Sequence, residues 1–94
     1  MCWQVFLKKQ TAKQIAKLSP NIVKAIRALV NEIEKFGPLR HNWKNFGKLK
    51  NTENLYHCHL KDGKPTYVAC WQVMDKKIKI VEVYYVGTHE KAPY

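Results

Sequence analysis

The chain has 94 residues, 46% of them apolar, which predicts a single domain over residues 1–94 with its own core. Its 17 Lys and Arg outnumber its 7 Asp and Glu, and the formal net charge of +10 favours polyanionic partners over a merely basic surface. The apolar runs are too short for a membrane span or signal peptide, and three widely spaced cysteines argue against a disulfide framework, so we expect a cytoplasmic protein without a membrane partner.

The first two elements are expected to be a strand and a helix. Residues 2–7 carry apolar side chains on both alternating faces, which favours a strand in the interior of a sheet. Residues 8–18 have a weak apolar stripe at helical spacing, with lysines facing outward.

A second, stronger helix is expected over residues 20–36. Ser19 is placed to cap its first amides, and Pro20 suits the first helical position, where an N–H is not needed. Gly37 and Pro38 then end it. The stripe expected to face the core consists of Ile22, Ile26, Leu29, Ile33 and Phe36.

Residues 39–54 are predicted to form a basic loop. Lys44, Lys48 and Lys50 are placed to contact phosphates. Trp43 lies among them, and two interpretations of its ring stay open: it stacks on an unpaired base, or it anchors the loop to the core.

Three strands are expected to follow, over residues 55–61, 66–73 and 77–86. Asp62 and Gly63 form a tight turn, and Pro65 suits the first position of the next strand. The last strand breaks its alternation at Ile80 and Val81, which indicates a bulge. The whole is an α+β domain of order β-α-α-β-β-β, with an antiparallel meander and a helical hairpin on one face.

Four residues near the end of the chain are candidates for one site. Alternation puts His57, His59 and Lys61 on the same face of their strand, and His89 and Tyr94 follow the last strand. An imidazole, with an unperturbed pKa of about 6.5, donates or accepts protons near neutral pH, and lysines stabilise developing phosphoryl charge. This set suits metal-free RNA cleavage, in which one group takes the 2′-hydroxyl proton and a second protonates the departing 5′ oxygen.

Other chemistries have weaker support. His57, His59 and His89 have none of the spacings typical of a zinc site, and Cys58 points to the opposite face of its strand. The only serine, Ser19, is used as a helix cap, so a serine nucleophile is not expected, and no cofactor is predicted. A pair of ordinary surface histidines stays an alternative.

Several fragments, taken in order, resemble the RelE/ParE toxin superfamily of bacterial type II toxin–antitoxin systems. They are the segments 47–50 (GKLK), 55–60 (LYHCHL), 67–73 (YVACWQV) and 86–91 (VGTHEK). The pairing of Cys58-His59 with a later Gly-Thr-His is most similar to the YafQ branch of RelE-like mRNA interferases, which use histidines. Relatives carry arginine where this chain has Tyr67 or Val68 and again at His89, so transition-state charge would fall to lysine or protonated histidine.

The resemblance implies a RelE-like microbial ribonuclease fold and a ribosome-dependent endoribonuclease that cuts mRNA in the A site without a cofactor. By position, His59 and His89 would be the acid–base pair, Tyr94 the aromatic that stacks on or helps cleave the message, and His57 would take the place of a further active-site residue. The implied phosphate contacts are Lys44, Lys48, Lys50, Lys61 and Lys91.

The resemblance also implies three macromolecular partners: an acidic antitoxin, ribosomal RNA and mRNA. The charge of +10 fits all three independently. Two other functions stay open at this stage, a ParE-like toxin that inhibits DNA gyrase by binding and a non-catalytic RNA-binding module.

Overall fold

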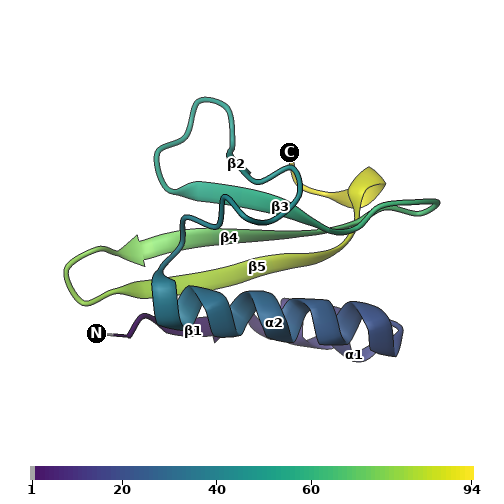
Figure 1. Ribbon diagram of the computed structural model, residues 1–94, viewed down its shortest axis with the longest axis horizontal. Helices are drawn as coiled ribbons and strands as arrows, with labels where there is room; N and C mark the ends of the chain where they lie inside the picture. Colours follow the sequence, from purple (N-terminus) through teal and green to yellow (C-terminus); the bar gives the residue numbers. More distant parts are fainter. Residues whose placement is uncertain (1) are drawn as a thin grey trace.

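The computed structural model describes residues 2–94. Within that range, five strands, two α-helices and one short 3₁₀ helix follow one another (Figure 1). In chain order they are β1 (Gln4–Leu7), α1 (Lys9–Ala16), α2 (Pro20–Phe36), β2 (Gly47–Lys48), β3 (Leu55–Lys61), β4 (Tyr67–Asp75), β5 (Ile80–Thr88) and η1 (His89–Lys91). The predicted α+β class and order are confirmed, and β2 is an addition inside the stretch that was predicted to be loop throughout.

The strands form one mixed sheet in the order β1-β5-β4-β3-β2. β1 runs parallel to β5, whereas β3, β4 and β5 form the predicted antiparallel meander. The interior position predicted for the first strand is wrong, because β1 is an edge strand on which Phe6 and Leu7 are 52% and 44% exposed. Although both faces of this segment are apolar, only Trp3 and Val5 pack against the core, and Phe6 and Leu7 stay partly in solvent.

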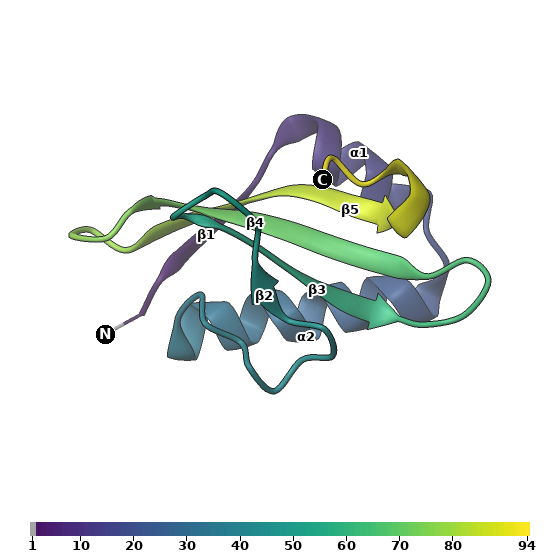
Figure 2. The same ribbon diagram turned by 90° about the horizontal axis from the view of Figure 1, so that it is seen from above.

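Both helices lie on one side of the sheet, and the chain after β5 lies on the other (Figures 1 and 2). The predicted stripe of α2 is buried at Ile22, Ile26, Leu29 and Ile33. It packs against Trp71 and against a set of valines that are almost fully buried: Val73 of β4 and Val81, Val83 and Val86 of β5. Phe36 is an exception to the prediction: it is 69% exposed at the end of the helix, with the guanidinium of Arg40 over its ring.

The two ends of α2 differ in how well the sequence predicted them. The predicted side-chain cap at Ser19 is wrong, because its hydroxyl makes no capping bond. The amide of Ile22, which such a cap would satisfy, donates instead to the backbone carbonyl of Ser19 at 3.1 Å. The end at Gly37 is as predicted: its φ of 97° favours glycine, and an added Cβ would lie 3.1 Å from the indole nitrogen of Trp3.

Register shifts decide which face the later strand residues occupy. One shift leaves Tyr84 without a partner on β4, so Tyr84 and Tyr85 both lie away from the helices while Val86 returns to the core. A second shift lies where the broken alternation predicted a bulge, although its extra residue is Met74 on β4, opposite Ile80. The side chain of Gln14 on α1 accepts a bond from the Val86 amide at 3.3 Å, just beyond the end of β1 pairing.

The connection between β3 and β4 is longer than the predicted tight turn. It spans residues 62–66, and Pro65 lies within it instead of opening β4. Neither helix of the described chain has the length and apolar character needed to cross a membrane.

Candidate active site

The sheet face away from the helices carries the candidate residues. His57 and His59 of β3 are in register with Cys70 and Val68 of β4, so all four side chains share this face. A small apolar cluster lies beside the two histidines. It is made of Val68, Cys70 and Tyr85, with Tyr84 and Ala92 packed against it.

The tail after β5 folds back over this face because three hydrogen bonds fix its start. The amide of His89 donates to the carbonyl of Thr66 at 2.8 Å, which ties η1 to the beginning of β4. The hydroxyl of Tyr85 donates to the carbonyl of Thr88 at 2.6 Å, and the amide of Ala92 donates to the carbonyl of His89 at 3.2 Å. Tyr85 passes so close to Gly87 that a Cβ there would lie 2.7 Å from its hydroxyl oxygen.

The four residues predicted as catalytic come together beneath this tail. The ring centroids of His59 and His89 are 5.8 Å apart, and those of His89 and Tyr94 are also 5.8 Å apart. The rings of His57 and Tyr94 are 4.8 Å apart and tilted by 34°. Residues from β3 and from the tail, thirty or more positions apart, therefore form one continuous group of rings, and their catalytic roles stay a prediction.

Asp62 belongs to this group although the sequence indicated only a turn residue. Its carboxylate binds Nδ1 of His59 at 2.6 Å and also forms an ion pair with the amine of Lys44. Lys44 supports His59 a second time, because its carbonyl accepts the His59 amide at 2.8 Å. The signal that would have found Asp62 is its spacing of three residues from His59 just before a turn, where a carboxylate can reach back to an imidazole.

The negative charge on Asp62 determines which ring nitrogen of His59 carries a proton. Hydrogen bonds from Lys44 and then from His59 hold the pKa of the Asp62 carboxyl below its usual value. An ionised carboxylate can only accept, so Nδ1 of His59 carries a proton, and in the neutral ring Nε2 is the free acceptor.

His57 and Tyr94 have a different environment from the His59 pair. Burial, followed by the charges of His59 and His89, lowers the pKa of His57, and its Nδ1 is buried without a hydrogen-bond partner. Burial is also the main reason that the pKa of the Tyr94 phenol is raised, so it stays protonated at neutral pH. At neutral pH the two rings together offer an uncharged, partly exposed aromatic surface.

The predicted phosphate contacts are scattered. Lys48 and Lys50 are exposed on and after β2, Lys91 is exposed on η1, and Lys44 is exposed but paired with Asp62. The prediction that Lys61 shares a face with His59 is wrong, because the register shift at the end of β3 pairs Lys61 with Tyr67.

Trp43 is used inside the protein. Its indole N–H donates to a carboxylate oxygen of Glu32 at 2.9 Å, and its ring packs against the core. The hydrogen bonds from Asn42, Trp43 and Arg40 together lower the pKa of Glu32 against the opposing effect of its burial. This geometry favours the interpretation that Trp43 anchors the loop to the core over the interpretation that it stacks on a base.

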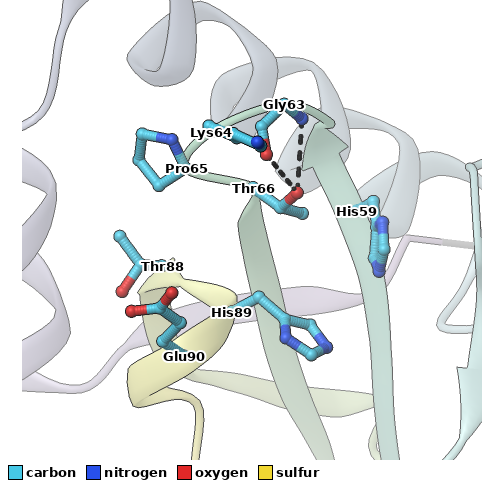
Figure 3. Close-up of a pocket in the computed structure, with 8 residues that line it drawn as sticks. All are labelled: His59, Gly63, Lys64, Pro65, Thr66, Thr88, His89 and Glu90. Atoms are coloured by element: carbon cyan, nitrogen blue, oxygen red, sulfur yellow. Dashed lines mark hydrogen bonds between the residues drawn. The ribbon is translucent and has the colours of Figure 1, made fainter.

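A hollow of about 530 Å³ opens beside His59 and His89 (Figure 3). One wall is the turn between β3 and β4, and the other is the end of β5 with the start of η1. Its lining residues are His59, Gly63, Lys64, Pro65, Thr66, Thr88, His89 and Glu90. A volume of this size falls in the range of small-ligand pockets, about 300–1,000 Å³.

Cysteine chemistry is disfavoured at this site on physical grounds. Cys58 and Cys70 are fully buried, as the strand pattern predicted, and burial raises the pKa of both thiols to about 12. Neither is a thiolate nucleophile at neutral pH. Across residues 2–94, no group of three or more His, Cys, Asp or Glu side chains is arranged to hold a metal ion.

The chain matches known proteins in its fold but not in its sequence. No family model and no curated protein matches the sequence. Among solved structures, the archaeal RelE–RelB complex from Pyrococcus horikoshii OT3 superposes with a TM-score of 0.76 at 21% identity, covering 98% of this chain and all of that one. The chain has the RelE-like fold.

Two further structures support the same fold. A mutant of the E. coli toxin RelE in the free state gives a TM-score of 0.74 at 21% identity, covering 96% of this chain and 86% of that one. The YoeB dimer from Staphylococcus aureus gives 0.72 at 17% identity, covering 95% of this chain and 99% of that one. The similarity in fold thus covers nearly the whole chain, whereas the resemblance in sequence was limited to fragments.

Proposed function

We propose that this protein is the toxin of a type II toxin–antitoxin pair and that it cuts mRNA on the ribosome as an endoribonuclease. The observation that supports this most is the meeting of His59, His89 and Tyr94 on one face of a RelE-like fold, with Asp62 holding His59. Two of the similar solved chains are RelE toxins and one is in complex with RelB, which supports the toxin assignment.

The geometry supports different roles for His59 and His89. His59, with Nδ1 bonded to Asp62, is the base: its Nε2 takes the proton of the 2′-hydroxyl as that oxygen attacks the phosphorus. His89, whose ring centroid lies 5.8 Å from that of His59, is the acid that gives its proton to the leaving 5′ oxygen. The P–O5′ bond breaks, a 2′,3′-cyclic phosphate forms, and the two proton transfers balance.

Lysines and Tyr94 complete the proposed machinery. Lys64 in the lining of the hollow and Lys91, two residues after His89, are the cations that would stabilise charge on the reacting phosphate. Tyr94, 48% exposed and tilted over His57, offers a ring on which a base of the message stacks. Lys48 and Lys50 would contact the RNA backbone or the ribosome farther out on the β2 side.

The partners follow from the charge. An acidic antitoxin would neutralise part of the +10 and cover the tail face, and binding to ribosomal RNA and mRNA would weaken with salt by about one decade per decade of salt for each phosphate neutralised. We propose the cytoplasm as the site of action, since ribosomes and mRNA meet there.

The test is expression of the chain followed by mapping of new mRNA 5′ ends. Wild type is expected to give cuts phased with codons, and His59→Ala and His89→Ala are each expected to lower cutting by roughly 10²–10⁴-fold, the usual contribution of a general acid or base. His41→Ala is the matched control, since His41 is exposed and lies against Phe46, away from the tail. Growth arrest with DNA breaks and intact message would indicate a gyrase inhibitor, and arrest by both variants at full strength would indicate binding alone.

A further inference from the structure

The hollow and Tyr94 lie on opposite sides of the His59–His89 pair. Tyr94 contacts His57 and His89, whereas the hollow begins at His59 and extends to the turn at residues 63–66. Along β3 the contact with Tyr94 therefore comes first, the His59–His89 pair second and the hollow third. With the scissile phosphate at the pair, as the proposed function requires, one neighbouring base lies on Tyr94 and the other reaches the hollow.

Glu90 gives this hollow an acid that the reaction above does not use. Figure 3 shows its carboxylate on the η1 side next to Thr88, across the hollow from Lys64 and Pro65. Within the described part of the chain, residues 2–94, Glu90 forms no ion pair and no side-chain hydrogen bond. In the same range Glu34, Glu53 and Glu82 also lack such partners, whereas Asp62 has Lys44 and His59, but Glu90 is the only acid among the residues that line the hollow.

The carboxylate of Glu90 is expected to repel the phosphates of an RNA strand and to bind the N–H groups of a nucleobase. A phosphate close to Glu90 would be repelled, so the backbone is expected to pass along the other wall of the hollow, where Lys64 lies. A nucleobase has no charge and presents N–H groups, which a carboxylate can accept. The hydroxyl of Thr66 does not compete for the base, because it donates to the carbonyl of Gly63 at 2.9 Å and accepts the Gly63 amide at 3.2 Å.

We propose that Glu90 reads a guanine next to the scissile phosphate. The Watson–Crick edge of guanine places an imino N–H and an amino N–H side by side, and the two oxygens of a carboxylate match this pair. Adenine and cytosine put an acceptor nitrogen beside their single amino group, and uracil flanks its one imino N–H with carbonyls. Each therefore forms one bond to the carboxylate and meets repulsion from the second oxygen.

The first test is a comparison of cut sites. In 5′-end maps, wild type is expected to favour guanine at one fixed position adjacent to the cut, by roughly tenfold to a hundredfold, the usual discrimination of one bidentate contact to a base edge. Glu90→Gln is expected to redistribute the cuts and remove this preference, because an amide cannot accept two bonds side by side. Glu53→Gln removes the same charge from an exposed acid elsewhere and is expected to keep the wild-type pattern.

Cutting without a guanine preference, or a preference unchanged in Glu90→Gln, would overturn the proposal while the nuclease function stood. A second measurement applies even if no cleavage is found: binding of short 2′-O-methyl RNAs that cannot be cut, carrying guanine, inosine or adenine at the position next to the scissile phosphate. Inosine lacks the amino group, so wild type is expected to bind guanine several-fold better than inosine, and Glu90→Gln is expected to bind the two equally. Equal binding by wild type would overturn the proposal.

Discussion

The two faces of the sheet are built in different ways. The helix face is covered by the long apolar stripe of α2 and contains most of the fully buried side chains. The opposite face is covered by a tail of a few residues, held at its start by bonds from Tyr85, His89 and Ala92. The buried core is therefore concentrated on one face and the proposed chemistry on the other, and variants on the two faces should separate stability from activity.

The largest expected effect on stability is on the helix face. Leu29 is 0% exposed in the middle of α2, and Leu29→Ala is expected to lower the free energy of unfolding by about 2–5 kcal/mol, because it removes buried carbons and leaves a cavity. Urea denaturation measures the loss. The exposed Leu39→Ala, outside the core, is the control and is expected to cost much less. A cost for Leu29→Ala below about 1 kcal/mol would contradict the assignment of stability to this face.

The next effect belongs to the tail face and leaves stability nearly unchanged. Asp62→Asn removes the negative charge at Nδ1 of His59, so cutting is expected to fall by roughly tenfold to a thousandfold, somewhat less than the loss of the base itself. Because the pKa of Asp62 is held low, the bond to His59 exists above the ordinary pKa of an aspartate and disappears as pH falls through the lowered value.

That sign gives a control within the same experiment. At every pH above the lowered pKa of Asp62 the wild-type bond is intact, so Asp62→Asn is expected to cut more slowly than wild type throughout this range. If Asp62→Asn cut at the wild-type rate at every pH, Asp62 would be a turn residue only. Asp75→Asn serves as a second control, because Asp75 accepts amide bonds in the other hairpin turn.

A smaller effect would test how the tail is held. Gly87→Ala places a Cβ within 2.7 Å of the Tyr85 hydroxyl oxygen, so it is expected to cost about 1–3 kcal/mol by displacing Tyr85 and breaking its bond to Thr88. In a Tyr85→Phe background the same glycine change is expected to cost less, because the oxygen it meets is gone. Thermal unfolding of the four proteins in this cycle gives the coupling, and strictly additive costs would show that the contact is unimportant.

The smallest effect concerns His57. Its pKa is lowered in the folded protein, so the folded state binds fewer protons, and the stability it contributes is present above the ordinary histidine pKa and lost as pH falls through the lowered value. Wild type is expected to lose a little more stability than His57→Phe between pH 7 and pH 5. Urea titrations at the two pH values measure this, and identical pH dependence in both proteins would exclude the role.

The helix face was the part that could be predicted from sequence. The stripe of α2 and the Gly37-Pro38 end are local patterns with one physical solution each, and both were confirmed except at Phe36. The position of β1 was wrong because alternation describes the faces of a strand and says nothing about its neighbours. Its place at the edge depends on the parallel contact with β5, far along the chain.

The candidate site was predicted only in part, because contacts between distant segments cannot be read from local patterns. The four rings were identified as residue types that suit the chemistry, and the structure brings them together. Asp62 was missed because its use depends on the loop that brings Lys44 to His59. Lys61 was placed on the wrong face because the register shift at the end of β3 changes its partner to Tyr67, and such shifts leave little trace in the pattern of apolar residues.

The parallel pairing of β1 with β5 also has a consequence for synthesis. Residues 4–7 find their partners at residues 80–83, so an emerging chain cannot complete its sheet until almost everything between them has been translated. The proposed acid, His89, comes later still. Under the proposed function, the ribosome that makes this protein would therefore carry an incomplete nuclease, unable to cut its own message, until nearly the whole chain has been translated and the sheet can close.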